Sequence, residues 1–187
     1  MTNKRFALAL LIFVCGALAY SFAAAAQQEK LQLDHLNRLS SRAQEVVEVN
    51  LDQTALRALT KLTAFSERDR AKWKDLTSSL RGVYVRGYEF EREGEYSSED
   101  IEAIRTQLRA PGWGRVAQVG GRNGSNDEVY LKQGNGELDA YAVISTAPKK
   151  ICVINVVGPM KPDEIGLLDR EFDISNCGKQ GNRHRSK

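Results

Sequence analysis

The second half of the chain consists of short β-type segments separated by glycine-rich turns, and this series constrains the fold more than any other feature. The segments are residues 115–120, 128–134, 138–147 and 151–159. The turns between the first three, GGRNGSND and Gly134-Asn135-Gly136, are typical of β-hairpins. The last segment contains ICVINVV, which is apolar at both strand parities, as is typical of a central covered strand. This half of the sequence therefore predicts consecutive antiparallel strands around a buried one.

The first half of the chain alternates helical and β-type patterns. Helices are predicted over 31–39, after Asp52, after Ser66 and after Ser97, with strands at 46–51 and 83–92 and a last helix over 164–172. Helical connections in the first half and hairpins in the second favour an α+β fold. We expect one domain over residues 27–174, with a mixed, largely antiparallel sheet of about six strands and helices mainly on one face.

The strand predicted at 83–92 changes parity along its length. Val83 and Val85 lie on one face of a regular strand, whereas Tyr88 and Phe90 lie on the other. A one-residue bulge at Gly87 would bring all four apolar side chains to the same face. The pattern therefore predicts a β-bulge at this glycine.

Residues 1–26 have the pattern of a secretory signal peptide that is cleaved. Lys4 and Arg5 precede an apolar run from Phe6 to Phe22, and Ala24-Ala25-Ala26 supplies small residues before Gln27. The apolar run has about 17 residues, which is the lower limit for a membrane-spanning helix. We expect an exported protein, located in a periplasm or at the cell exterior, with no membrane span after cleavage.

The charge of the chain does not favour nucleic-acid binding. The formal charge is +3, and it falls to +1 when Lys4 and Arg5 leave with the signal peptide. Residues 175–187 are polar and basic, and they are predicted to form a disordered tail.

Two cysteines remain after the predicted cleavage, Cys152 and Cys177. An exported protein meets an oxidising environment, so a disulfide between them is one interpretation. The alternative is a buried apolar Cys152 in its strand and a free Cys177 thiol in the tail.

Motifs for catalysis and for cofactors are absent from the sequence. His35 and His184 lie at opposite ends of the chain, outside any cluster with metal-ligand spacing, and no G-x-S-x-G motif occurs. We expect no metal, no other cofactor and no catalytic residue that the sequence alone identifies.

Glutamates at alternate positions are the strongest candidate for a binding site. Glu89, Glu91 and Glu93 share one face of a strand that continues through them, and Arg86 lies close by in the sequence. Such a row can steer a basic partner, which we take to be a protein of the cell envelope. The alternatives are a solvated strand edge that prevents aggregation, or a Ca²⁺ site.

Two other functions are consistent with the sequence. A hydrolase acting on envelope material could use Glu89 and Asp100 as acid and base, which requires both carboxyl groups to face one cleft. A purely structural envelope protein would need no specific partner.

Four blocks of the chain resemble a bacterial exported family, domain of unknown function 4252. They are RAQEVVEVNLD, GVYVRGYEFEREGEY, LRAPGWGRV and APKKICVINVVGP, within residues 31–174. The resemblance implies export and a loose link to envelope signalling. It implies no catalytic residue, because the family offers none. Members described as lipoproteins carry a lipidation cysteine, and this chain lacks one.

Overall fold

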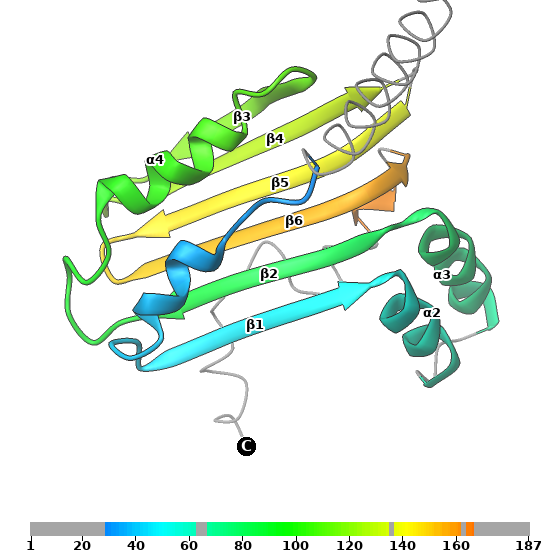
Figure 1. The fold of residues 1–187 in the computed structure, drawn as a ribbon, viewed down its shortest axis with the longest axis horizontal. Coiled ribbons are helices and arrows are strands. Elements are labelled where there is room, and N and C mark those ends of the chain that lie inside the picture. The colour runs from blue at the N-terminus through cyan, green and yellow to red at the C-terminus, as the bar shows by residue number, and fades with distance from the viewer. Residues whose placement is uncertain (1–28, 63–66, 135–136, 162–163, 167–187) are drawn as a thin grey trace, which may run out of the picture.

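The computed structural model describes residues 29–62, 67–134, 137–161 and 164–166 (Figure 1). The described helices are a 3-10 helix η1 (Asp34–Leu39) and the α-helices α2 (Gln53–Leu62), α3 (Glu67–Ser79) and α4 (Ser98–Gln107). The described strands are β1 (Glu45–Asp52), β2 (Gly82–Glu89), β3 (Trp113–Gly120), β4 (Asn126–Gly134), β5 (Glu137–Ala147) and β6 (Lys150–Met160).

The six strands form one sheet in the order β1-β2-β6-β5-β4-β3, and every neighbouring pair is antiparallel. The predicted α+β class with a six-stranded sheet is confirmed. Residues 151–158 of β6 are all buried, as expected for the ICVINVV segment. The chain crosses from β2 to the opposite edge of the sheet through α4, and β3 to β6 then follow as hairpins.

The predicted bulge at Gly87 is wrong. Gly87 pairs with Val47 on β1 and with Cys152 on β6 in an unbroken register. The parity change has a different cause, because the sheet has a core on each face. Val83 and Val85 belong to one core, and Tyr88 belongs to the other.

Helices contribute to both cores. Leu36 of η1 and Ile104 of α4 pack against one face (Figure 1). Leu56 of α2 and Leu76 of α3 belong to the core on the other face. The α-helical hairpin therefore covers one end of the second face.

A glycine in the apolar strand β6 lies where the connection from α3 to β2 packs closely against this strand. Gly158 has a φ of +128°, and a Cβ on it would lie 2.7 Å from the backbone nitrogen of Arg81. The same nitrogen donates a 2.7 Å hydrogen bond to the Val157 carbonyl. Only glycine combines this φ with so close an approach.

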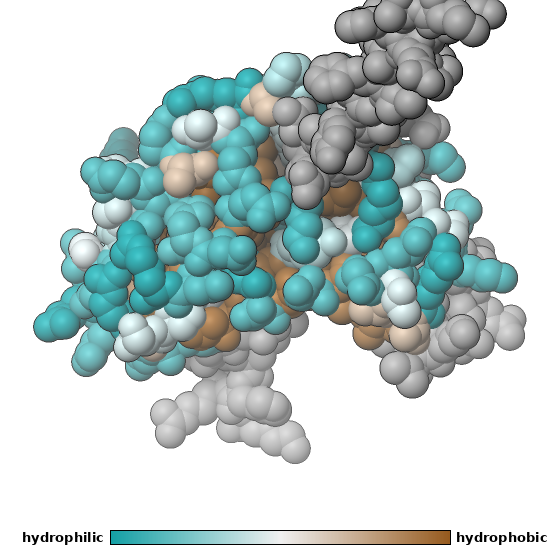
Figure 2. Space-filling view, viewed as in Figure 1, coloured by the Kyte–Doolittle hydropathy of each residue, from teal (hydrophilic) through white to brown (hydrophobic). Residues whose placement is uncertain are grey.

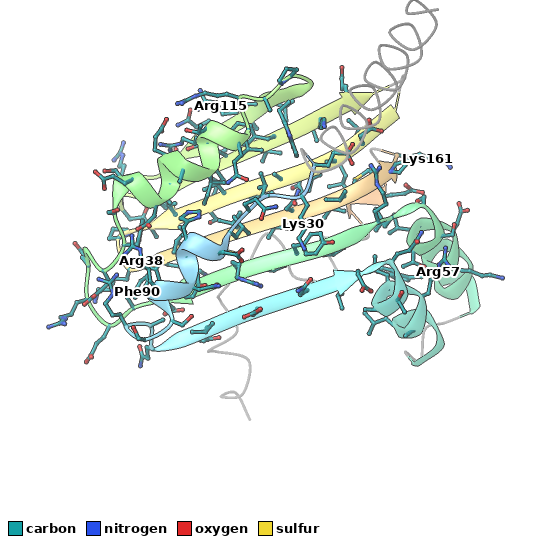
Figure 3. All side chains as sticks on the ribbon, in the orientation of Figure 1. Lys30, Arg38, Arg57, Phe90, Arg115 and Lys161 are labelled. Atoms are coloured by element: carbon teal, nitrogen blue, oxygen red, sulfur yellow. The ribbon has the colours of Figure 1, made fainter. Side chains whose placement is uncertain are left out.

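The segment before η1 is held by a side chain of the central strand. Asn155 is fully buried; its Oδ1 accepts a 2.9 Å hydrogen bond from the Leu31 N–H, and its Nδ2 donates a 3.1 Å bond to the Glu29 carbonyl. This pairing keeps residues 29–33 out of the helix predicted over 31–39, so η1 begins only at Asp34. Lys30 lies over β2, 4.1 Å from the Tyr84 ring centroid (Figure 3).

The outer surface over α4 and β3 is mainly hydrophilic, and apolar side chains are visible in the gaps between elements (Figure 2). Within the described residues, no helix has the length and apolar character needed to cross a membrane. The helix predicted over 164–172 lies mostly outside the described residues, as do residues 1–26 and 175–187.

Candidate functional site

The row of glutamates does not lie on one strand. β2 ends at Glu89, and residues 91–96 form turns and bends in which Gly94 has a φ of 78°. β2 is also an inner strand, between β1 and β6, so Glu89 is not on a sheet edge. The predicted alternation on one face is therefore wrong, because the strand stops where the chain turns towards α4.

The predicted partner-binding residues differ in their surroundings. Arg86 is mostly buried and forms a 2.9 Å ion pair with Glu48 on β1, so its side chain joins the two neighbouring strands. Glu89 pairs in register with Glu45 on one side and with Lys150 on the other.

Glu91 and Glu93 are the exposed carboxylates of the turn. Among the described residues, no cationic side chain lies within ion-pair distance of either one. Glu95, by contrast, pairs with Arg92 at 3.1 Å and with Arg42 at 3.8 Å. The turn therefore presents two unneutralised carboxylates, at Glu91 and Glu93.

The turn is anchored at both ends. The rings of Phe90 and Tyr96 stack with centroids 6.0 Å apart, and the Tyr96 hydroxyl donates a 2.7 Å hydrogen bond to the Ala147 carbonyl. Burial raises the pKa of Tyr96. Phe90 and Arg38 lie together at this end of the sheet (Figure 3).

Asp100 has a structural role at the start of α4. Its side chain is 3% exposed; its Oδ2 accepts a 2.8 Å hydrogen bond from the Ser97 N–H, and its Oδ1 is paired with Arg38. Both carboxyl oxygens are thus engaged in holding the helix N-terminus and η1. The pairing of Glu89 with Asp100 as acid and base gains no support from this arrangement.

An open cavity of about 510 Å³ lies beside the N-terminal half of α4. Its walls come from the turn, α4 and the ends of β3, β4 and β5. The lining residues are Glu93, Gly94, Tyr96, Ser97, Ser98, Ile101, Arg105, Gln118, Asn126, Thr146 and Pro148. Of the predicted site residues, Glu93 alone lines this cavity.

A buried carboxylate lies behind the cavity. Glu128 on β4 is 0% exposed and forms an ion pair with Arg105 of α4. It also accepts hydrogen bonds from the Tyr130 hydroxyl at 2.6 Å and from the Asn126 amide at 2.8 Å. Arg115 on β3 lies 3.6 Å away, close to α4 (Figure 3).

This cluster settles the charge state of Glu128. Burial by itself raises the pKa of the carboxyl, but the hydrogen bonds from Arg105 and Tyr130 outweigh burial and lower it. The hydrogen bond to Glu128 raises the pKa of Arg105. Glu128 is therefore a stable anion that ties α4 to the sheet.

The sequence analysis missed Glu128 and Arg105. The side chains of Glu128, Tyr130 and Lys132 lie on one face of β4. In an alternating strand, such a polar face is ordinarily expected to be exposed to solvent. The signal that could have indicated a buried cluster is Tyr130, an aromatic residue on the face that the pattern predicts to be exposed to solvent.

Cys152 is disulfide-bonded. The other two cysteines, Cys15 and Cys177, lie outside the described residues, so the pairing of Cys152 with Cys177 stays a prediction. Among the described residues, no three His, Cys, Asp or Glu side chains are grouped in a way that could hold a metal ion.

The fold and the site define an antiparallel α+β domain with an anchored acidic turn beside a polar cavity. The profile of the family described as "Domain of unknown function (DUF4252)" matches residues 40–168. The chain belongs to this family, as the four sequence blocks indicated. No curated protein and no solved structure matches the chain.

Proposed function

We propose that this protein is an exported, non-enzymatic interaction or sensing module of the bacterial cell envelope. The observation that carries the proposal is the pair of exposed carboxylates, Glu91 and Glu93, which have no cationic side chain within ion-pair distance among the described residues. The family assignment is consistent with an unknown function, and export rests on the signal-peptide pattern of residues 1–26.

The surroundings of the two glutamates favour recognition of a basic protein surface. Tyr96 and Phe90 hold the turn in place, so little conformational entropy is lost when a partner binds. Unpaired surface carboxylates speed the approach of a positively charged partner and select against an acidic one. A link to envelope signalling is the finer form of this proposal and rests on the family resemblance.

The test is an affinity capture from envelope extracts with a charge-reversed turn. The variant carries Glu91→Lys and Glu93→Lys. A matched control carries Asp34→Lys and Asp75→Lys, which make the same change in net charge at exposed positions outside the turn. Circular dichroism and thermal unfolding first establish that all three proteins fold equally.

We expect a protein that the wild type and the control retain and the turn variant loses. Its retention should also weaken as salt concentration rises, because exposed charges are screened. Equal recovery by all three proteins, or no specific protein with any of them, would contradict the proposal.

A further inference from the structure

Most of the residues that line the cavity beside α4 carry polar side chains. Eight of its eleven lining residues carry polar side chains, and the apolar ones are Ile101 and Pro148. The cavity is also open to solvent. Pockets for apolar small molecules are enclosed and mainly lined by hydrophobic side chains, so this cavity is unsuited to them.

An anionic ligand does not fit the cavity either. The N-terminus of α4 faces it, but two carboxylates already occupy that end of the helix. Asp100 accepts the Ser97 N–H, and the pKa of Glu99 is lowered by a hydrogen bond from its own backbone N–H and then by one from Ser97. Glu93 is a further carboxylate, and it lies on the cavity wall itself.

A cationic ligand is disfavoured by a positive charge on the opposite wall of the cavity. Arg105 lines the cavity and stays charged, because its hydrogen bond to Glu128 raises its pKa. Glu93 is the carboxylate among the lining residues, so the two charges on the walls balance. The remaining class is a neutral ligand that is rich in hydrogen-bonding groups.

The amide groups of the cavity are held in fixed orientations. The Asn126 Nδ2 donates to the buried Glu128, which turns its Oδ1 towards Gln118. The Gln118 Nε2 then donates a 2.9 Å hydrogen bond to that Oδ1. Gln118 retains a carbonyl oxygen and a second amide hydrogen, one acceptor and one donor, for a ligand.

The cavity also contains an aromatic surface. Tyr96 lines it, and the stacking of its ring on Phe90 at an interplanar angle of 29° fixes the ring plane. Sugars combine hydroxyl groups, each a donor and an acceptor, with C–H faces that pack on aromatic rings.

We propose that this cavity binds a neutral sugar unit of an oligosaccharide or glycan, with Gln118 and Glu93 contacting hydroxyl groups and Tyr96 packing against the ring. The open shape suits one unit of a longer chain, because neighbouring units can extend into solvent. This binding does not depend on a protein partner at Glu91.

The test is a titration of the purified protein with defined sugars, followed by NMR chemical shifts of backbone amides. The neutral probes are maltotriose, the N-acetylglucosamine trimer and N-acetylglucosamine itself. Charged comparators are trigalacturonic acid and the glucosamine trimer. We expect a neutral trisaccharide to shift the amides of Ser98, Gln118 and Thr146 with a Kd on the order of 1 mM or tighter.

Two variants locate the binding. Gln118→Ala should weaken it about three- to tenfold, because one neutral hydrogen-bonding partner is lost. Gln133→Ala, an exposed glutamine of β4 outside the cavity, should leave it unchanged. Tighter binding of the trisaccharide than of N-acetylglucosamine assigns a glycan chain, and equal binding assigns a free sugar.

The proposal is overturned if no neutral sugar shifts these amides, or if only the charged trimers bind. It is also overturned if Gln118→Ala and Gln133→Ala behave alike. A Glu91→Lys variant separates it from the proposed function, because this residue is outside the cavity and sugar binding should persist.

Discussion

Glu128 is a buried carboxylate with four polar side chains around it: Arg105, Tyr130, Asn126 and Arg115. It joins α4 to β3 and β4 and also orients the amide of Asn126 at the cavity. A buried anion contributes to stability only while its partners remain, since an unsatisfied buried donor or acceptor costs about 1–3 kcal/mol.

Glu128→Gln should lower the free energy of unfolding at neutral pH by about 1–3 kcal/mol, because Arg105 loses its anionic partner. The pKa of Glu128 in the folded protein is lower than its ordinary value of 4.5. The stability that this group contributes is therefore fully present above the unfolded pKa and is lost as pH falls through the folded pKa.

Urea unfolding at a series of pH values checks this prediction. The difference between wild type and Glu128→Gln should shrink as the pH falls below about 4.5. Asp127→Asn, a change at the exposed neighbouring residue, should have a small effect at every pH. A difference that stays constant into strong acid would show that the charge of Glu128 is not what stabilises the fold.

At the scale of elements, the N-terminal segment 29–39 is bound across the sheet. Leu31, Leu33, Leu36 and Leu39 are buried, and Asn155 of β6 holds the backbone at Glu29 and Leu31. Glu29 also forms an ion pair with Arg81, and Lys132 lies 3.7 Å from it. The segment is thus a covering layer of the core rather than a loose leader.

Asn155→Ala should release the beginning of this segment, because two buried backbone groups lose their partners. We expect the amides of residues 29–33 to exchange hydrogen at least tenfold faster, with a loss of stability of about 1–3 kcal/mol. Amides of β5 should stay protected. Asn50→Ala, on the exposed face of β1, is the matched control.

Hydrogen exchange measured by mass spectrometry on both variants tests whether Asn155 holds this segment. If the segment stays as protected in Asn155→Ala as in wild type, leucine burial alone holds it and the role assigned to Asn155 is wrong.

The elements also show where the sequence was sufficient and where it was not. The glycine turns and the ICVINVV run predicted β4, β5 and β6 well, because hairpin pairing is local in sequence. The parity change in β2 was interpreted as a bulge because a single core was assumed. Covering of the second face depends on segments far away in the chain, which periodicity within one strand cannot report.

At the scale of the whole molecule, the predicted export would place Cys152 in an oxidising environment. Cys152 is disulfide-bonded, and removal of residues 1–26 would leave Cys177 as the other cysteine of the chain. A bridge closing a loop of this length typically stabilises a fold by about 2–4 kcal/mol.

Protein isolated from its producing cells should begin at Gln27 and contain a Cys152–Cys177 bridge. Its intact mass should be lower than that of the reduced form by the mass of two hydrogens, and no thiol should react with an alkylating reagent before reduction. Peptide mapping without reduction checks the pairing. An intact N-terminus, or a bridge from Cys152 to Cys15, would contradict the prediction.

The sequence by itself determined the fold class, the buried central strand and the family, because these depend on local periodicity, turn residues and spaced blocks. It also located the acidic segment. Only the tertiary structure decided which charged side chains of this segment stay unpaired, since Arg42, the partner of Glu95, and Glu48, the partner of Arg86, come from other parts of the chain. The cavity and the Glu128 cluster likewise form only when α4 crosses onto β3 and β4, and contacts between such distant residues leave no periodic signal in the sequence.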